Sequence, residues 1–241
     1  MDRKLLKMES RKQLSGNIST FIVSYLIIGA FGWAISLICN FLPIPPHLFS
    51  VLATDWSQKC TWINAFQMPG GVELLPILIK STVTASVSLF LSFFIAAPFA
   101  LSMSYMSLKV SHNGKTELSE TFSGFSRYGK SLWLMFLIVF WETILSLLFI
   151  IPGIIASYSY KMSFFVLAEN PNLTGRQAML ESKRLMKGHR WEYFVFELSF
   201  FWWYLLCIVT FGIATFYVAP YMMVAATNFY NRLKENDKKL I

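Results

Sequence analysis

Four ionisable side chains lie within or at the edge of long apolar stretches of this 241-residue sequence: Lys80, Glu142, Lys161 and Glu197. An unpaired charge inside a lipid bilayer costs about 3 kcal/mol or more. Such residues therefore mark either ion pairs that hold helices together or pathways for protons, ions or substrates. Lys80 is close to the end of its stretch, so its long side chain can reach the membrane surface. These four are the candidate intramembrane polar residues.

The spacing of Glu142 and Lys161 predicts that these two side chains meet. Glu142 lies 10 residues before Pro152, and Lys161 lies 8 residues after Gly153. Because a helix rises about 1.5 Å per residue, their depths differ by only about 3 Å in a hairpin that turns at this Pro-Gly pair. We expect a buried ion pair that fixes the hairpin's register, and a transport pathway is the alternative. Glu197 is expected to be held by a basic residue of the preceding segment, Lys187 or Arg190.

The sequence contains no arrangement of residues that is typical of an enzyme. Its 3 histidines, His47, His112 and His189, are far apart in the chain, and no HExxH, CxxC, GxSxG or P-loop pattern occurs. An intramembrane enzyme would need acid–base groups or metal ligands that face one cavity. We therefore predict a protein without catalytic, cofactor-binding or metal-binding residues, and an intramembrane enzyme is the weakest of the alternatives.

The composition is that of a membrane protein. Hydrophobic residues make up 55% of the chain and charged residues only 14%, whereas a soluble domain carries about 25% charge. The net charge of +8 does not indicate nucleic-acid binding, because the basic residues sit in short segments beside apolar runs. We therefore expect lipid to surround much of the chain.

The positions of the charges predict six transmembrane helices, since about 20 apolar residues are needed to cross a bilayer. Two stretches are too long for one crossing and are divided at Pro152-Gly153 and near Thr210-Phe211-Gly212, with Pro220 as a rival break in the second. The fold class is therefore all-α, a polytopic bundle of three helical hairpins. The predicted spans are residues 18–41, 75–105, 132–151, 154–168, 193–210 and 213–230.

The orientation follows from the Lys and Arg residues of the connections. The segments 1–17, 106–130, 169–192 and 231–241 each contain four or five of them, whereas the loop 43–73 contains only Lys59. Basic connections stay on the cytoplasmic side. We therefore expect both termini in the cytoplasm and the loop 43–73 outside.

A short motif is repeated before two of the hairpins: Glu9–Gly16 recurs as Glu181–Gly188, and residues 118–130 are a weaker relative. Around the second copy, Thr174 and Gln177 form a capping-box pattern that predicts an amphipathic helix over 174–187. We expect this helix, and the first copy, to lie in the membrane interface. The alternative is a solvated helix that packs on the bundle. The candidate headgroup-binding residues are Arg176, Lys183, Arg184 and Lys187, with Leu180 out of place among the polar residues.

Several blocks of the C-terminal half resemble a known family: Phe149–Ile155, Ala168–Pro171, Met186–Trp191 and Thr210–Ile213. In their order and spacing they are similar to an uncharacterised family, a domain of unknown function, of multi-pass integral membrane proteins common in Gram-positive bacteria. The resemblance covers about residues 117–233. It implies a multi-helix bundle in the bacterial cytoplasmic membrane and no particular activity. The family usually has a small polar residue at the position of Glu142, so a role for Glu142 would be particular to this chain.

These observations predict a non-enzymatic accessory or scaffold protein that holds a partner or lipid at the cytoplasmic face. The main alternative is a small transporter or permease subunit for a lipid-like or amphipathic substrate. The expected partners are membrane lipids and another membrane protein, and not nucleic acid. The sequence predicts no oligomeric state.

Overall fold

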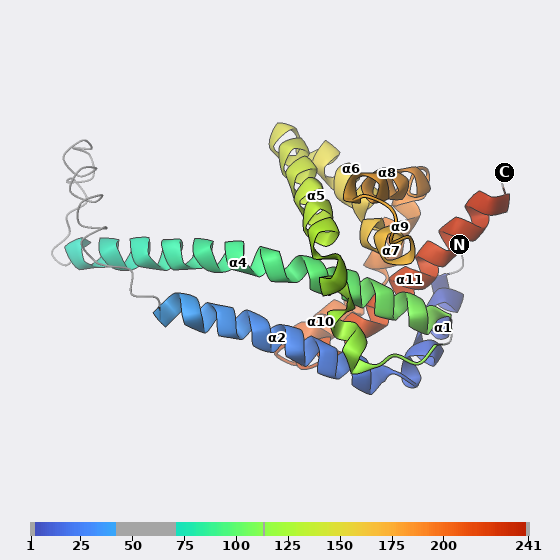
Figure 1. Cartoon of the computed structure of the whole chain (residues 1–241), viewed down its shortest axis with the longest axis horizontal. Helices are drawn as coiled ribbons and strands as arrows, with labels where there is room; N and C mark the ends of the chain where they lie inside the picture. Colours follow the sequence, from blue (N-terminus) through green and yellow to red (C-terminus); the bar gives the residue numbers. More distant parts are fainter. Residues whose placement is uncertain (1–2, 42–70, 113, 240–241) are drawn as a thin grey trace. The chain divides into compact units, whose positions relative to one another are not determined.

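The computed structural model describes residues 3–41, 71–112 and 114–239, with side chains for 3–37, 86–112 and 114–237, and these residues form helices without a strand. The predicted loop 43–73 lies almost entirely outside this part. In chain order (Figure 1) the elements are α1 (Arg3–Ser15), α2 (Ile18–Phe41), α4 (Gly71–Ser111), the 3-10 helix η2 (Leu118–Arg127), α5 (Tyr128–Leu148), α6 (Ile150–Tyr160), α7 (Ser163–Glu169), α8 (Gly175–Leu185), α9 (Arg190–Leu198), α10 (Phe201–Val209) and α11 (Thr215–Lys239).

The chain divides into two compact units. The smaller one, residues 29–94, contains the C-terminal part of α2 and the N-terminal part of α4, where the rings of Phe90 and Phe94 lie 5.0 Å apart. The larger one, residues 1–28 and 95–241, contains all the other elements and is called the main unit below. The candidate site residues with described side chains all belong to the main unit.

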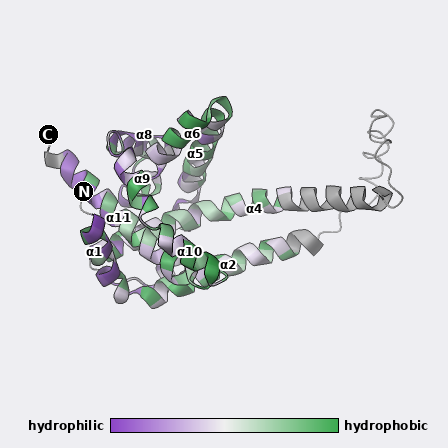
Figure 2. Cartoon of the chain, turned by 180° about the vertical axis from the view of Figure 1, so that it is seen from behind, coloured by the Kyte–Doolittle hydropathy of each residue, from purple (hydrophilic) through white to green (hydrophobic). Residues whose placement is uncertain are grey.

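In the part of the chain that the structure describes, five segments are long and apolar enough to cross a membrane: Ile18–Leu37, Ser86–Ser111, Leu118–Leu148, Ile150–Glu169 and Arg190–Val209. They are rich in hydrophobic residues, as the colouring of α6 and α10 shows (Figure 2), and many of their large apolar side chains are exposed. Leu147 is 88% exposed and Ile150 is 77% exposed. So large an area of exposed apolar side chains needs a lipid environment. The prediction of a helical membrane protein is confirmed.

The sixth predicted span, 213–230, is not among these five segments. It forms the first part of α11, which contains Thr227 and Asn228 among apolar residues and is not one of the five apolar segments. Its inner face is buried by protein, with Val224 and Ala225 fully enclosed. A helix enclosed by other helices can carry polar side chains that a lipid-facing helix cannot. The count of six spans is therefore not confirmed.

The turn of the second hairpin lies before the Pro-Gly pair, and not at it. α5 ends at Leu148, Phe149 is extended (φ −155°, ψ 139°), and α6 begins at Ile150. Pro152 thus stands in the first turn of α6, where a missing N–H costs no helical hydrogen bond. Gly153 instead permits close packing, because a Cβ there would lie 2.2 Å from Ser146 Oγ of α5.

The turn before α11 matches the prediction better. Phe211 and Gly212 have φ values of 50° and 88°, and Thr215 begins α11. Pro220, the rival break, lies inside α11. Glycine adopts such a positive φ without strain, which explains why the chain reverses here.

The amphipathic helix predicted over 174–187 is α8. Its capping box between Thr174 and Gln177 is present, and Gly188 follows it with a φ of 87°. The apolar face is buried against α5, α6 and α7 and includes Ala178, Met179, Ser182 and Leu185. α1 is likewise buried through one face against α11. In both helices protein, and not lipid, covers the inner face. This agrees with the alternative prediction, in which the helix packs on the bundle.

The close contact at Gly153 gives a first prediction. Gly153→Ala should lower the stability of the protein by about 1–3 kcal/mol, because the added methyl group must displace Ser146 or separate α5 from α6. The control Gly129→Ala places a methyl group in open space on α5 and should be neutral or stabilise by up to about 1 kcal/mol. Thermal unfolding in detergent measures both. Equal stability of the two variants would contradict the packing described.

Candidate functional site

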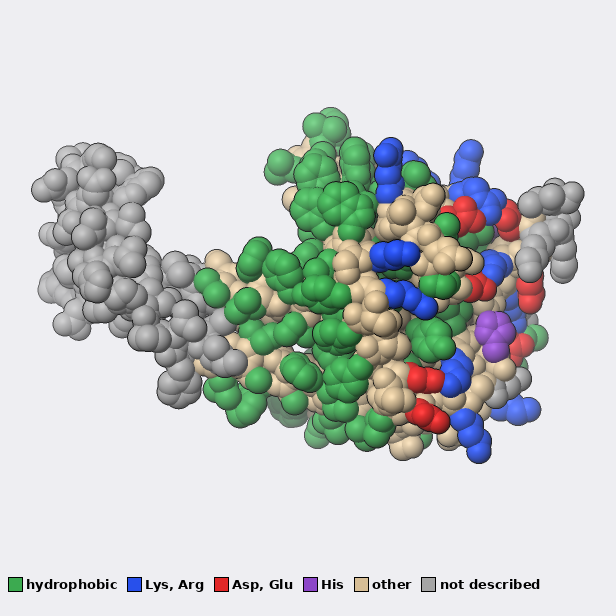
Figure 3. Space-filling model, viewed as in Figure 1, with side chains coloured by type: hydrophobic (Ala, Val, Ile, Leu, Met, Phe, Trp, Pro, Cys, Tyr) green, Lys and Arg blue, Asp and Glu red, His purple; other side chains and the backbone are tan. Residues whose placement is uncertain are grey.

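Charged side chains gather at one end of the main unit, where α1, α8 and the C-terminal half of α11 lie (Figure 3). Hydrophobic side chains cover α5 on the same face (Figure 3). We call this charged region the polar end. The candidate intramembrane residues Glu142, Lys161 and Glu197 lie in apolar segments of α5, α6–α7 and α9.

Lys161 forms an ion pair with Glu197, its Nζ 2.9 Å from Oε1 of the carboxylate. The predicted pair between Lys161 and Glu142 is not formed: among the described residues Glu142 has no ion pair within 4.0 Å. The reason is that Lys161 follows the last residue of α6, which packs against α9 as well as α5. Among the described residues, Glu197 also forms no ion pair with Lys187 or Arg190, the partners expected from the sequence.

The ion pair lies at an interruption in a membrane-crossing segment. The helix stops after Tyr160 and resumes at Ser163. The side chain of Ser182 of α8 hydrogen-bonds the backbone at this interruption. Its hydroxyl accepts a hydrogen bond from the backbone N–H of Met162 at 3.2 Å and donates one to the carbonyl of Ser159 at 2.8 Å. Ser182 is completely buried. Without it, two backbone groups would be left unpaired in an apolar region.

A second interruption separates α9 from α10, and α1, the helix that contains the other copy of the repeated motif, reaches it. Lys7 of α1 donates a hydrogen bond to the carbonyl of Ser199 at 2.7 Å, and its ammonium lies 4.1 Å from the centre of the Phe200 ring. A cation at the C-terminal end of a helix is favourable because the helix dipole is negative there. Lys161 and Lys7 thus occupy the ends of two half-helices, α6 and α9.

The polar end contains an open pocket of about 890 Å³ that sequence reasoning missed. It is formed by α1, α4, the end of α7 and α11, and its lining residues are Glu9, Gln13, Ser111, His112, Glu169, Asn228, Asn231, Arg232, Lys234, Glu235 and Asn236. None of the intramembrane candidates lines it. Its signal in the sequence was the run of amide and charged residues at the end of the last predicted span, residues 227–237.

Side chains of α11 hold the walls of this pocket together. Arg232 pairs with Glu9 at 2.9 Å, and Lys234 pairs with Glu169, whose carboxylate also accepts a hydrogen bond from Tyr230 at 2.6 Å. Asn228 donates hydrogen bonds to Ser10 at 2.9 Å and to Gln13 at 2.8 Å. α11 is therefore tied to α1 and α7 by charged and amide groups.

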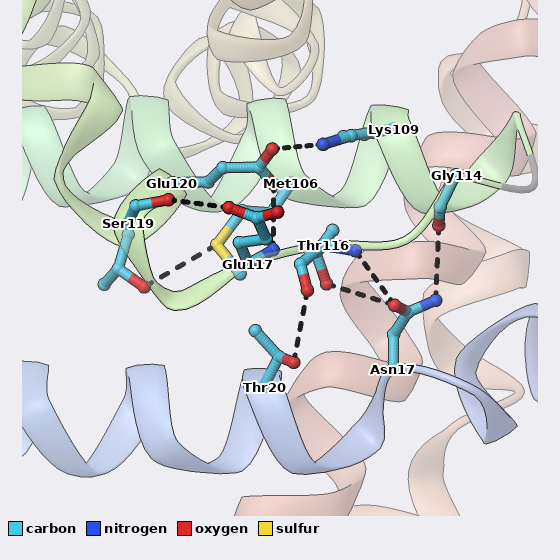
Figure 4. A network of polar contacts seen from close by, with 10 residues as sticks. Asn17, Thr20, Met106, Lys109, Gly114, Thr116, Glu117, Ser119 and Glu120 are labelled. Atoms are coloured by element: carbon cyan, nitrogen blue, oxygen red, sulfur yellow. Dashed lines mark hydrogen bonds and ion pairs between the residues drawn. The ribbon is translucent and has the colours of Figure 1, made fainter.

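A neighbouring network fixes the connection between α4 and η2 (Figure 4). The amide oxygen of Asn17 accepts a hydrogen bond from the backbone N–H of Thr116 at 3.0 Å, and its NH₂ donates to the carbonyl of Gly114 at 3.3 Å. Thr20 donates to the Thr116 carbonyl at 3.4 Å, and Lys109 pairs with Glu120. A second pocket of about 510 Å³ adjoins Asn17.

The four candidate headgroup-binding residues are not equivalent. Arg184 is bound by Glu181 at 2.7 Å and by Asp237 of α11 at 2.8 Å, and its hydrogen bonds hold the pKa of Asp237 below the ordinary value. Arg184 thus joins α8 to α11. Arg176, Lys183 and Lys187 are exposed. The side chain of Lys80 lies outside the described residues.

Residues 138–237 match the model of a protein family described as a protein of unknown function (DUF975). The predicted resemblance to an uncharacterised family is thereby confirmed for this region. It contains Glu142, Lys161, Glu197 and most of α11. Comparisons with curated proteins and with solved structures found no match.

The ion pair of Lys161 gives a second prediction. Lys161→Leu and Glu197→Leu should each destabilise the protein more than the double replacement does, because each single change leaves one charge without its partner. The coupling energy should be about 0.5–3 kcal/mol. Unfolding of the four proteins in detergent measures it. The control Lys183→Leu, at an exposed position, should change stability by less than about 0.5 kcal/mol. Additive effects of the two changes would refute the pairing.

Proposed function

We propose that this integral membrane protein is a non-enzymatic accessory protein of the bacterial cytoplasmic membrane that holds a partner protein at its polar end. The Lys and Arg residues of the connections favour placing that end in the cytoplasm. The open pocket of about 890 Å³ carries the proposal. It is wide, polar and built from four helices, as a surface for a partner's loop or terminus requires.

The state of the intramembrane charges supports this proposal. In transporters, interrupted helices expose half-helix ends that bind substrates and coupling ions. Here Lys161 is paired with Glu197, and Lys7 is bound to the Ser199 carbonyl at the other interruption. The chain's own cations thus take the places that a transported cation would need.

A transporter or permease subunit for an amphipathic substrate is the second candidate. The two interruptions in membrane-crossing segments favour it, because such breaks are costly and are common in transporters. The candidates differ in what Lys161 and Glu197 do. An accessory protein needs them for packing, whereas a transporter needs them for the transport cycle.

Photo-crosslinking in cells tests the proposal. A photoreactive amino acid at Glu235 or Asn236, both in the pocket, should give the same discrete protein adduct. The control position Leu147, on the exposed apolar surface, should not give it. The Lys161→Leu/Glu197→Leu double variant should keep the adduct.

Two results would contradict the accessory role. The first is the absence of an adduct from both pocket positions although the variants reach normal levels in the membrane. The second is loss of the adduct in the double variant although its thermal stability is unchanged, which would favour the transporter.

A further inference from the structure

One flank of α8 carries a stripe of exposed residues that the packing of the bundle does not use. Arg176, Leu180, Lys183 and Lys187 follow one another at spacings of 4, 3 and 4 residues. With 3.6 residues per turn, positions at this spacing share one face of a helix and its immediate continuation. The stripe thus consists of three cations with one leucine between them.

These side chains are free in the part of the chain that the structure describes. All four are exposed, Leu180 by 50%, and no ion pair or hydrogen bond joins any of the three cations to another described side chain. The acid of the helix, Glu181, lies on the other flank, where it binds Arg184. No acid therefore offsets the charge of the stripe within α8.

The stripe also lies close to the membrane surface. Four residues after Lys187 comes Trp191, which is 72% exposed and stands at the start of a membrane-crossing segment, Arg190–Val209. Exposed tryptophans at the end of such a segment mark the headgroup level. The inner face of α8 packs against α5, α6 and α7, which also belong to membrane-crossing segments.

We propose that this flank of α8 binds the headgroups of anionic phospholipids, with Leu180 inserted between them. Three cations without an acid match the phosphates of an anionic surface, and one exposed leucine among cations is typical of an interfacial helix. The site explains why Leu180 is apolar on an otherwise polar flank. It does not depend on which partner the pocket of the polar end holds.

Lipid selectivity of the full-length protein tests the site. The protein is placed in phosphatidylcholine nanodiscs, and the association of spin-labelled phosphatidylglycerol is compared with that of spin-labelled phosphatidylcholine. Arg176→Gln/Lys183→Gln/Lys187→Gln should lower the preference for phosphatidylglycerol by about fivefold or more. The control Lys12→Gln/Lys115→Gln/Arg127→Gln removes the same charge from α1, the α4–η2 connection and η2, and should change the preference far less. An equal fall in both variants, or none in the first, would overturn the proposal.

The depth of Leu180 provides a second, independent measurement. An environment-sensitive fluorophore on Leu180→Cys, in a variant whose Cys39, Cys60 and Cys207 are replaced by Ser, should emit at shorter wavelength in anionic nanodiscs. A headgroup-linked quencher should quench it. The same fluorophore on Glu235→Cys should remain in water. If position 180 behaves like position 235, the flank faces solvent or an acidic protein partner, and the lipid site is wrong.

Discussion

The enclosure of α11 by the other helices is the constraint on which the main unit depends. A helix that carries Thr227, Asn228 and Asn231 along one face is stable at membrane depth only if protein supplies hydrogen-bond partners. α1 and α4 supply them: Ser10 and Gln13 bind Asn228, Ser107 accepts from Thr227 at 2.8 Å, and Ser111 accepts from Asn231 at 3.0 Å. The pocket at the polar end exists because these helices converge on α11.

The two copies of the repeated motif have related roles in this arrangement. Each copy belongs to a short helix that is buried through one face and that reaches an interruption in a membrane-crossing segment. α8 does so through Ser182 of its copy, and α1 does so through Lys7, two residues before its copy. Each copy also contains a glutamate that is linked to α11. Glu9 pairs directly with Arg232 of α11, whereas Glu181 pairs with Arg184, which in turn pairs with Asp237 of α11. The repeat therefore supports the membrane helices from one end, and α8 keeps one flank free for the lipid surface.

Much of this architecture could be predicted from local patterns. The helical class, the capping box at Thr174 and the reversal at Phe211-Gly212 depend on residues close together in sequence, where propensities and turn chemistry decide. Contacts between distant helices could not be predicted in this way. The hairpin pattern predicts that Lys161 faces Glu142 of its hairpin partner, but the position of Lys161 after the end of α6 brings it to Glu197 of α9. Pro152 likewise favours a turn in the sequence, but the first turn of a helix accepts proline equally well.

The pocket could not be predicted either, because it also depends on contacts between helices that are distant in sequence. Its walls come from four helices, and none of them shows by itself that its polar residues converge. The low hydropathy of α11 was the available signal, and it indicates a protein-enclosed helix when the surrounding segments are apolar enough to face lipid.

Labelling along α11 tests its enclosure most directly. Single cysteines at Val224 and Ala225, with the native cysteines replaced by Ser, should be protected from a water-soluble maleimide and from a lipid-borne probe alike, since both positions are buried. A cysteine at Phe216, which is more exposed, should react with the lipid-borne probe. Reaction of position 224 or 225 with the lipid-borne probe in the folded protein would show that lipid surrounds α11, and would contradict the account.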